Sequence, residues 1–294
     1  MKQKSAGIAV IGVGLIGGSI IRDLQKNSNR FGNIYGIVDD PSASYAKNRG
    51  FIHDTLTYNQ LPGKVDFIII SSPIFTIAEI SQKIHNAFEN KPSNKKITII
   101  DVASVKSSIA STFENLTTSQ LEFIATHPMA GTEFSGLDHA RLGMFKGKPW
   151  IISRHKKNTD EGISQVKSFI HFLGGRLKEL DAEKHDTYAA AVSHTTILLS
   201  NYIFDFLSDR YPEALDLAGS GFDSTTRLAS GNPELHNSIM HSNTKTINKI
   251  LSEFKVFLEL KSSVDELPVD YFSSNKEKRD RWLSKKTIVQ DKDK

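Results

Sequence analysis

The sequence predicts an α/β protein in two parts: an N-terminal part built on a parallel β-sheet, followed by an all-helical C-terminal part. Over the first 180 residues, short runs rich in β-branched residues alternate with amphipathic stretches, and after that the strand-like runs stop. A glycine-rich turn directly after the first strand-like run points the same way, because such turns open the first helix of many parallel-sheet domains. At 294 residues the chain is long enough for two modest domains.

Seven segments of the N-terminal part are predicted strands. Their apolar residues follow one another with little polar alternation, which is typical of parallel strands buried on both faces. The segments are Gly7–Ile11, Ile34–Val38, Val65–Ile70, Ile97–Asp101, Glu122–Ala125, Trp150–Ser153 and Arg176–Leu180. Between them, helical spacing of apolar residues predicts helices over Leu15–Lys26, Ile74–Phe88 and Glu161–Leu173.

Two long amphipathic helices are predicted in the C-terminal part. Apolar residues recur at helical spacing from His185 to Leu207 and again from Thr244 to Leu260. So much apolar surface on so few helices favours burial against a second copy, and we expect a homodimer through this region. We therefore expect a sheet domain at residues 1–180, a helical substrate and dimerisation domain at 181–272, and a charged tail at 273–294.

Composition and charge argue against several classes of protein. The sequence has no cysteine, which excludes disulfides, thiolate metal sites and a cysteine nucleophile. The segment from Lys276 to Lys294 has eight basic and four acidic residues and so carries the whole net charge of +4, as a solvated terminus would. No apolar run approaches the roughly 18–20 residues of a membrane span. We expect a cytoplasmic protein that binds neither nucleic acid, membrane nor metal.

The sequence GVGLIG after the first predicted strand indicates a Rossmann-type dinucleotide-binding domain. In such a turn Gly12 permits the tight bend, and Gly14 leaves room where the pyrophosphate approaches. Gly17 lets the helix pack close to the strand. Leu15 and Ile16 begin that helix, whose unpaired N–H groups face the phosphates. The merely structural alternative is a glycine turn without a ligand.

Two further segments are placed to bind the same cofactor. Asp39 follows the second predicted strand, where a carboxylate binds the ribose hydroxyls and repels a 2′-phosphate, which favours NAD over NADP. The alternative is that Asp39, Asp40 and Pro41 cap the next helix. Ser72 and Pro73 end the third of the listed strands at the same edge of the sheet, and they could equally form a helix cap with a first-turn proline.

Two later segments place polar side chains where the nicotinamide end of the cofactor should lie. The sequence DVASVK begins at Asp101, and HPMAGTE begins at His127, each at the carboxyl end of a predicted strand. A histidine there is a candidate general base, because its ordinary pKa near 6.5 lets it accept a proton at neutral pH. Taken alone, His127 could also be a packed loop histidine.

Five motifs together resemble the prephenate and arogenate dehydrogenase family. In the family's order they are GVGLIGGS at Gly12–Ser19, DVASVK at Asp101–Lys106, HPMAGTE at His127–Glu133, VSH at Val192–His194 and GFDSTTR at Gly221–Arg227. The resemblance spans roughly Gly7 to Leu260. It implies an NAD(P)-dependent oxidoreductase that oxidatively decarboxylates prephenate to 4-hydroxyphenylpyruvate, or arogenate to tyrosine, in tyrosine biosynthesis.

The resemblance also implies roles for single residues. His127 resembles the family's catalytic histidine, which takes the proton of the substrate's ring hydroxyl, and Ser104 resembles the serine that hydrogen-bonds that hydroxyl and the histidine. Arg227 matches the arginine that binds a substrate carboxylate, and Ser193 and His194 match polar residues of the same pocket. The local alternatives are a surface salt bridge for Arg227 and a buried helix histidine with a neighbouring partner for His194.

The sequence departs from the family's pattern on the substrate side and beside the cofactor. Ile197 stands where many relatives have a second histidine, and His236 where they often have tryptophan. The acidic residue near the Thr-Arg pair is displaced to Asp223, and Val38 occupies the usual place of the ribose-binding acid.

Two other classes of function are weaker hypotheses. A β-hydroxyacid dehydrogenase or an imine reductase shares a glycine-rich domain followed by helices, but neither needs the HPMAG sequence. A nucleotide-sensing protein without catalysis would not need His127, Ser104 and Arg227 together, and the sequence keeps all three.

Overall fold

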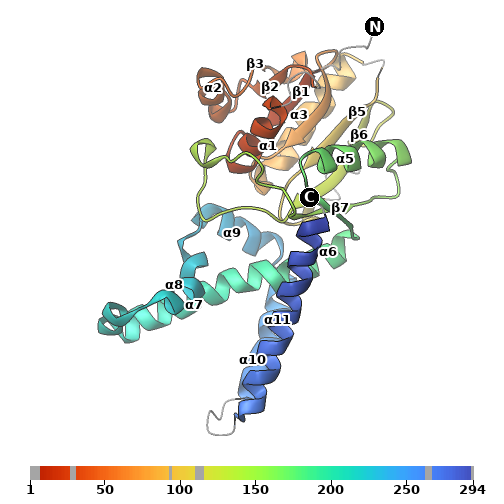
Figure 1. The fold of residues 1–294 in the computed structure, drawn as a ribbon. Coiled ribbons are helices and arrows are strands. Elements are labelled where there is room, and N and C mark those ends of the chain that lie inside the picture. The colour runs from red at the N-terminus through yellow and green to blue at the C-terminus, as the bar shows by residue number, and fades with distance from the viewer. Residues whose placement is uncertain (1–6, 27–30, 93–94, 110–115, 262–266, 293–294) are drawn as a thin grey trace.

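A computed structural model describes residues 7–26, 31–92, 95–109, 116–261 and 267–292. An eight-stranded sheet with helices on both faces forms the N-terminal part, and the C-terminal part that is described consists of helices (Figure 1). The strands are β1 (Gly7–Ile11), β2 (Ile34–Ile37), β3 (Asp54–Leu56), β4 (Val65–Ile70), β5 (Ile97–Asp101), β6 (Leu121–Pro128), β7 (Pro149–Ser153) and β8 (Arg176–Glu179). The helices are α1 (Leu15–Gln25), α2 (Pro41–Asn48), α3 (Ile77–Asn90), α5 (Asp160–Phe172), α6 (Ala182–Ala189), α7 (Thr195–Arg210), α8 (Ser220–Thr226), α9 (Pro233–Ser242), α10 (Thr244–Glu259) and α11 (Val269–Lys292).

The strand order creates a topological switch point at the middle of the sheet. The order is β3-β2-β1-β4-β5-β6-β7-β8, so the chain runs outward from β1 to β3 and then returns to β4 on the other side of β1. The connections that follow β1 and β4 therefore leave the sheet in opposite directions. In open α/β sheets ligands bind in the crevice at such a switch point, outside the carboxyl ends of the strands.

The expectation of a wholly parallel sheet is wrong at one pair of strands. β6 and β7 are antiparallel, with His127 opposite Ile151. A parallel neighbour needs a crossover connection that returns the chain to the start of the strand, usually through an α-helix. The connection over 129–148 has only a short 3₁₀ turn at Leu137–His139, and the chain comes back directly along the strand it has just left.

The seven predicted strands are all present, and one difference matters for the site. β6 continues to Pro128, three residues beyond the prediction, so that His127 belongs to the strand rather than to a loop. The three-residue strand β3 was not expected, because it lies at the edge of the sheet and is only partly buried. The helix expected from Ile74 begins as a 3₁₀ turn before α3.

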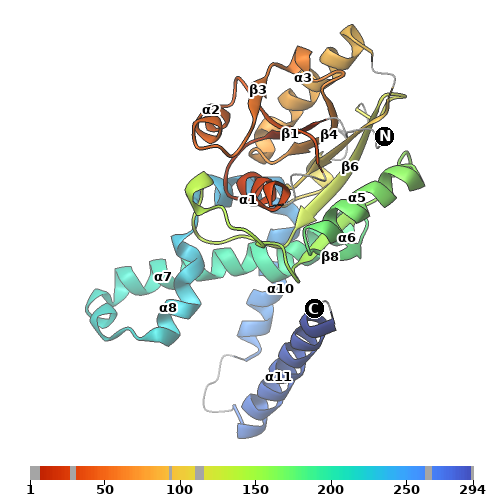
Figure 2. The same cartoon turned by 45° about the horizontal axis from the view of Figure 1, so that its top comes forward.

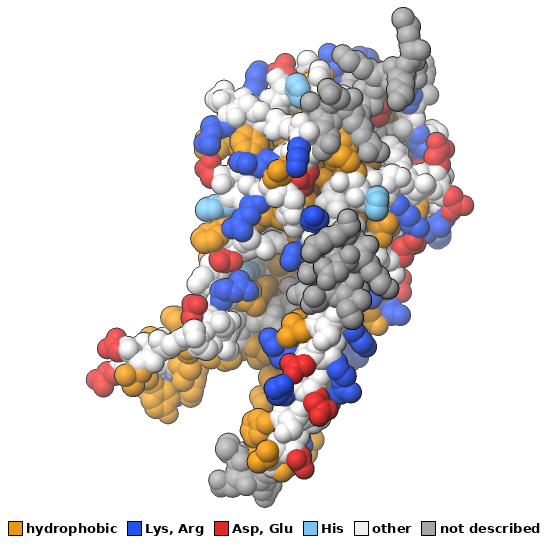
Figure 3. All heavy atoms as spheres, in the orientation of Figure 1, with side chains coloured by type: hydrophobic (Ala, Val, Ile, Leu, Met, Phe, Trp, Pro, Cys, Tyr) orange, Lys and Arg blue, Asp and Glu red, His pale blue; other side chains and the backbone are white. Residues whose placement is uncertain are grey.

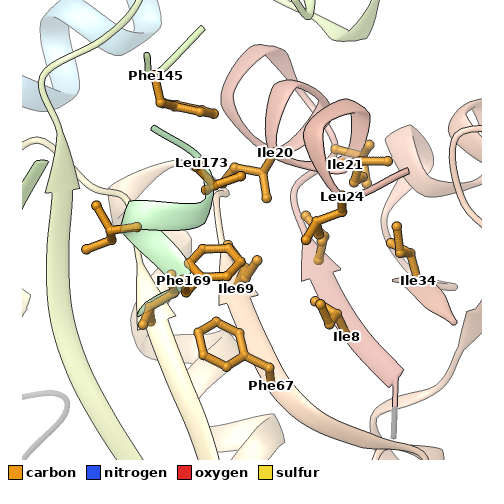
Figure 4. Packing of buried hydrophobic residues seen from close by; sticks show 14 of the residues in the cluster. Ile8, Ile20, Ile21, Leu24, Ile34, Phe67, Ile69, Phe145, Phe169 and Leu173 are labelled. Carbon is orange, nitrogen blue, oxygen red and sulfur yellow. The ribbon is translucent and has the colours of Figure 1, made fainter. Parts of the chain in front are cut away.

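Two apolar layers hold the sheet between its helices. On one face Ile8, Phe67 and Ile69 of the strands pack against α1 and α5 (Figure 4). On the other face the alternate strand residues, such as Ala9 and Ile68, pack against α3. Successive side chains of a strand point to opposite faces, so a strand buried on both faces is apolar at nearly every position. This accounts for the apolar runs in the sequence.

The C-terminal helices form arms that extend away from the sheet domain (Figures 1 and 2). α6 continues through a π-helical turn, Ala190–His194, into α7. The arm of α7 and α8 exposes large apolar side chains (Figure 3); those of α7 include Tyr202, Phe204 and Phe206. None of the described helices is long and apolar enough to cross a membrane.

The charged tail expected at 273–294 forms most of helix α11 as far as Lys292. Its side chains through Lys285 are exposed or half-buried. A helix was not expected here because the segment has no apolar stripe. Ion pairs one turn apart, such as Lys276–Asp280 at 2.6 Å, accompany its helical backbone instead.

A buried ion pair ties the carboxyl ends of β5 and β6 together. The side chains of Lys106 and Asp101 are both fully buried and in contact. The Lys106 ammonium also donates to the carbonyl of Thr126 at 2.6 Å, and Asp101 accepts the N–H of Thr126 at 2.9 Å. Burial lowers the pKa of Lys106, and the neighbouring Asp101 carboxylate opposes that shift. The pair fixes the loop that carries Ser104 against the strand that carries His127.

We expect Lys106→Met to lower the free energy of unfolding by about 3–5 kcal/mol, because it leaves the Asp101 carboxylate buried without its ammonium partner. Denaturant titration followed by circular dichroism measures the loss. Lys83→Met is the control, since Lys83 forms an exposed pair with Glu79 one turn away on α3 and its removal should change little. Equal losses in the two variants would contradict this account of the buried pair.

Candidate active site

The glycine-rich turn lies at the switch point of the sheet, between β1 and α1. Gly12 has a φ of 91°, a backbone conformation that glycine adopts without strain. Its N–H donates to Asp40 Oδ2 at 2.9 Å, and the N–H of Val13 donates to the hydroxyl of Ser42, also at 2.9 Å. Leu15 and Ile16 follow as the first residues of α1 and are half-buried.

Asp40 and Asp39 have different surroundings. Asp40 caps α2, accepting the N–H of Ser42 at 2.9 Å, and it also holds the glycine-rich turn. The capping alternative therefore holds for Asp40. Asp39 is exposed at the end of β2, next to Val38, which is also exposed. The carboxylate expected to bind ribose thus lies at the surface, beside the turn rather than in it.

Ser71, Ser72 and Pro73 follow β4, on the other side of the switch point from the end of β2. The hydroxyl of Ser71 donates to the carbonyl of Gly12 at 2.5 Å, which joins the two turns. The hydroxyl of Ser72 is buried and has no hydrogen-bond partner within the described part of the chain. Pro73 is exposed and is itself the N-cap of the 3₁₀ turn, with no side-chain capping hydrogen bond, so the alternative of a serine cap with a first-turn proline is wrong. A buried hydroxyl without a partner at a switch point can bind a ligand.

His127 is buried in a cluster of polar side chains drawn from both parts of the chain. Its Nδ1 lies 2.9 Å from Nε2 of His185, on α6. Nδ1 of His185 lies 2.7 Å from Oδ1 of Asp186. Asp186 accepts the backbone N–H groups of Lys106 and Ser107, at 2.7 and 2.8 Å. One carboxylate therefore connects the first helix of the C-terminal part to the loop after β5 and, through His185, to β6.

His194 lies in the same cluster. It is buried at the end of the π-helical turn, and its Nδ1 lies 3.3 Å from Nδ2 of Asn243. Asn243, between α9 and α10, also donates to the carbonyl of Asp186 at 2.9 Å. His194 thus has the neighbouring partner that the local alternative expected. Its Nε2, however, is buried without a partner within the described residues.

Burial keeps both histidines neutral near pH 7. Desolvation lowers the pKa of His127 well below 6.5, and the nearby His185, Lys106 and His194 lower it further. Desolvation also lowers the pKa of His194 to about 4, although Asp186 opposes that shift. A neutral imidazole can accept a proton, which is the property that a general base requires.

The remaining candidates lie around this cluster, and Arg227 lies outside it. Ser104 is half-buried on the loop after β5 and makes no hydrogen bond to His127 in the described structure. Ser193 is half-buried beside His194 in the π-helical turn. Arg227 is about half exposed and pairs with Glu133 of the HPMAGTE segment at 3.2 Å. This ion pair is a second contact between the helical part and the loop after β6.

Sequence reasoning missed His185, Asp186 and Asn243 as members of the site. His185 entered the sequence analysis only as the start of a predicted helix. The signal that could have found it is a His-Asp pair at the first turns of that helix, shortly before the VSH motif. Within the described residues, no group of three or more histidine, aspartate or glutamate side chains is arranged to hold a metal ion.

Comparison with known families assigns both parts of the chain. The nucleotide-binding domain of prephenate dehydrogenase matches residues 20–179, and the dimerization domain of prephenate dehydrogenase matches residues 181–273. The glycine-rich turn precedes the first of these matches, so its role as a binding site rests on the geometry described above.

Named relatives and solved structures agree with these matches. Prephenate dehydrogenase of Bacillus subtilis is 25% identical over 95% of this chain and 77% of its own length. Cyclohexadienyl dehydrogenase of Zymomonas mobilis is 25% identical over 95% of this chain and 96% of its own. The structure of A. aeolicus prephenate dehydrogenase in complex with hydroxyphenyl propionate and NAD+ superposes with a TM-score of 0.84, at 27% identity, over 96% of this chain and 99% of that one. Arogenate dehydrogenase of Synechocystis gives a TM-score of 0.71 at 25% identity, over 97% and 99% of the two chains. The chain belongs to the prephenate dehydrogenase family.

Proposed function

We infer that the protein is an NAD-dependent prephenate dehydrogenase, which oxidatively decarboxylates prephenate to 4-hydroxyphenylpyruvate in tyrosine biosynthesis. The observation that carries this function is His127, a buried and neutral imidazole at the carboxyl edge of the sheet, in a chain that matches the family over both domains. At that edge a Rossmann-type sheet presents its cofactor to the substrate.

The residues at the switch point fit a dinucleotide. A Cβ atom added to Gly14 would meet no heavy atom within 4 Å, so the backbone there is open to a ligand. A Cβ on Gly12 would lie 2.5 Å from the N atom of Ser72, and a Cβ on Gly17 would collide with the Gly12 carbonyl and the Ser71 hydroxyl. Only glycine fits at 12 and 17, and the space at Gly14 is where a pyrophosphate approaches. We propose that these glycines hold the pyrophosphate at the start of α1.

The other cofactor contacts follow from the same placement. Leu15 and Ile16 would offer the first N–H groups of α1 to the phosphates. Ser72 and Pro73 would line the opposite wall, with the unpartnered Ser72 hydroxyl turned to the cofactor. Asp39 would reach the adenosine ribose from the surface and disfavour the 2′-phosphate of NADP.

The proposed reaction divides the work between a base and positioning groups. His127 takes the proton of the ring hydroxyl as hydride leaves the carbon that bears it, and Ser104 hydrogen-bonds that hydroxyl. Bound NAD supplies the hydride acceptor. The bond to the ring carboxylate then breaks, carbon dioxide leaves, and its electron pair completes the aromatic ring. The proton on His127 returns to the phenol oxygen, so that charge and atoms balance. Because the ring becomes aromatic, orientation is the enzyme's main task.

Substrate carboxylates need cationic or donor groups, and we propose Arg227 for this role, with Ser193 and His194 lining the pocket. A guanidinium binds a carboxylate through paired, charge-assisted hydrogen bonds. Arg227 now pairs with Glu133, so its guanidinium already sits opposite a carboxylate at 3.2 Å.

Arogenate is the second candidate substrate. It is favoured by Ile197, a buried apolar residue one turn beyond His194, which offers no group to the pyruvyl side chain of prephenate.

We further propose a homodimer formed through the C-terminal helices. The family's dimerization domain matches residues 181–273, and α7 exposes aromatic side chains that a second copy would cover. A boundary at residues 180 and 181 separates the sheet domain from this helical domain in the proposal. We also propose that the protein acts in the cytoplasm.

The direct test mixes the purified chain with prephenate or arogenate and with NAD or NADP, and follows reduced nicotinamide by absorbance. We expect the highest kcat/KM with prephenate and NAD, since Asp39 lies where a 2′-phosphate would meet a carboxylate. A higher kcat/KM with arogenate would transfer the assignment to the second candidate. No turnover with either acid would overturn the proposed function, and a lower KM for NADP would overturn the role of Asp39.

A matched pair of glycine variants tests the cofactor site. Gly14→Ala should leave the unfolding transition unchanged and raise the KM for NAD by about tenfold or more, because its methyl group stands where the pyrophosphate approaches. Gly17→Ala should instead lower the free energy of unfolding by about 1–3 kcal/mol, because its methyl group collides with the Gly12 carbonyl. Thermal unfolding and steady-state kinetics separate the two effects. A normal KM for NAD in Gly14→Ala would place the pyrophosphate elsewhere.

His127→Asn should lower kcat by about 10²–10⁴-fold while both KM values stay within about threefold. An asparagine side chain reaches as far as Nδ1 and keeps the contact with His185, but it has no group at the position of Nε2. Steady-state kinetics at saturating NAD measures the loss.

The wild-type pH profile is the companion measurement. A base works when it is unprotonated, and burial lowers the pKa of His127, so kcat/KM should remain flat from neutral pH to below 6.5. If kcat/KM fell on acidification to half its maximum at a pH of 6.5 or above, His127 would not be the base. A near-normal kcat in His127→Asn would show the same.

A further inference from the structure

Three side chains form a continuous hydrogen-bonded row that ends at His127. Asp186 Oδ1 lies 2.7 Å from His185 Nδ1, and His185 Nε2 lies 2.9 Å from His127 Nδ1. All three residues are buried. The rings of His127 and His185 meet edge to face, with centroids 5.1 Å apart.

With one proton on each ring, the row permits only one arrangement of those protons. An ionised carboxylate only accepts hydrogen bonds, so His185 must carry its proton on Nδ1 and donate it to Asp186. Nε2 of His185 is then an acceptor. His127 must therefore carry its proton on Nδ1 and donate it to His185, which leaves Nε2 of His127 unprotonated.

The carboxylate at the start of the row is held ionised by its other contacts. Burial raises the pKa of Asp186, but the hydrogen bonds from His185, Lys106 and Ser107 together outweigh it, and the pKa is lowered. Backbone N–H groups cannot turn around, so both Asp186 oxygens must remain acceptors. The direction of the row is thus fixed from the backbone of the loop after β5.

We propose that His185 and Asp186 are positioning residues that hold His127 in the tautomer whose unprotonated Nε2 faces the substrate. The proposal rests on the proposed function in one respect, that His127 is the base. When His127 accepts the substrate's proton at Nε2, its Nδ1–H stays bonded to His185, and Asp186 stabilises the positive charge along the row. The logic is that of the Ser-His-Asp triad, with a second histidine between base and carboxylate.

The other charged or titratable groups around His127 do not hold its ring in this tautomer. The Lys106 ammonium is engaged by Asp101 and the Thr126 carbonyl. His194 is held by Asn243 and lies to one side of the row. Among the described side chains, His185 is the hydrogen-bond partner of the His127 ring.

The first experiment compares two replacements of His185 in the full-length chain. The His185→Gln variant can place an amide oxygen where Nε2 was and still accept the His127 proton, whereas the His185→Leu variant offers no acceptor. We expect the leucine variant to lose about 10²-fold or more in kcat, with KM for prephenate and NAD within about threefold, and the glutamine variant to regain at least about tenfold of that loss. The exposed His241 of α9 provides the control variant His241→Leu, with kcat unchanged.

The second experiment observes the tautomer without substrate. Protein labelled with ¹⁵N-histidine has ten histidines, and the resonances that vanish in His127→Asn belong to His127. In the wild type, we expect Nδ1 of His127 to give the shift of a protonated ring nitrogen and Nε2 that of an unprotonated one. In His185→Leu the proton should move to Nε2.

These measurements separate failure of the proposal from failure of the proposed function. Two results would overturn the positioning role of His185 and Asp186. One is a protonated Nε2 of His127 in the wild type, and the other is a His185→Leu variant whose kcat stays within about threefold of wild type. Loss of activity in both His185 variants in proportion to a loss of folded protein, with no glutamine rescue, would also overturn it, because a structural role alone gives that result. If the wild type shows the expected tautomer of His127 but does not turn over prephenate, the proposed enzyme activity is wrong. The role of His185 and Asp186 in setting the tautomer would then still hold. If His185→Leu does not fold, the wild-type spectrum and the kcat of His185→Gln still test whether His185 sets the tautomer of His127.

Discussion

The carboxylate of Asp186 joins the two parts of the chain at the place where the proposed chemistry occurs. It belongs to the first helix of the C-terminal part, yet it accepts two backbone N–H groups from the loop after β5 and one from the ring of His185. A carboxylate with three donors is strongly localised, because each oxygen must satisfy its partners in a low-dielectric site. The position of α6, of His185 and therefore of the His127 ring follows from this one group.

The cluster combines charges that balance with rings that remain neutral. Lys106 is buried beside Asp101, so that pair adds no net charge next to His127. Burial and proximity lower the pKa values of His127 and His194, so neither ring adds a positive charge near neutral pH. A buried uncompensated charge would cost several kcal/mol, and here each ionised group has a partner of opposite sign or several hydrogen bonds. The stability of this region and the unprotonated state of His127 therefore have the same physical origin.

The fold and the cofactor turn could be predicted from the sequence, because both depend on local patterns. Apolar runs located the strands, and GVGLIG located the turn whose glycines at 12 and 17 have no room for a side chain. The antiparallel β7 could not be predicted, because periodicity gives the same pattern for either direction of a strand. Asp40 rather than Asp39 holds the glycine-rich turn, and two adjacent acids do not reveal which one turns inward.

The position of His194 beside this row could not be predicted for a geometric reason. His194 follows His185 by nine residues, which in a regular α-helix corresponds to about 900° and places the two side chains on opposite sides. The π-helical turn at Ala190–His194 accommodates one additional residue, so that the effective rotation is about 800° and the two rings come within about 80° of each other. Nothing in the sequence marks this turn. The turn brings His194 to the site, where Asn243 contacts both its ring and the carbonyl of Asp186.

The distribution of charge also gives the proposed substrate an orientation. Burial keeps His127 and His194 neutral, and the Lys106 ammonium is engaged by Asp101, so the deep end of the site suits an uncharged hydroxyl better than a carboxylate. Arg227, by contrast, is half exposed and lies across from Glu133, where charge is solvated. A dianion with one hydroxyl would therefore enter with the hydroxyl toward His127, with at least one carboxylate toward Arg227. The same burial that keeps His127 unprotonated thus excludes the carboxylates from its surroundings and orients the reacting carbon.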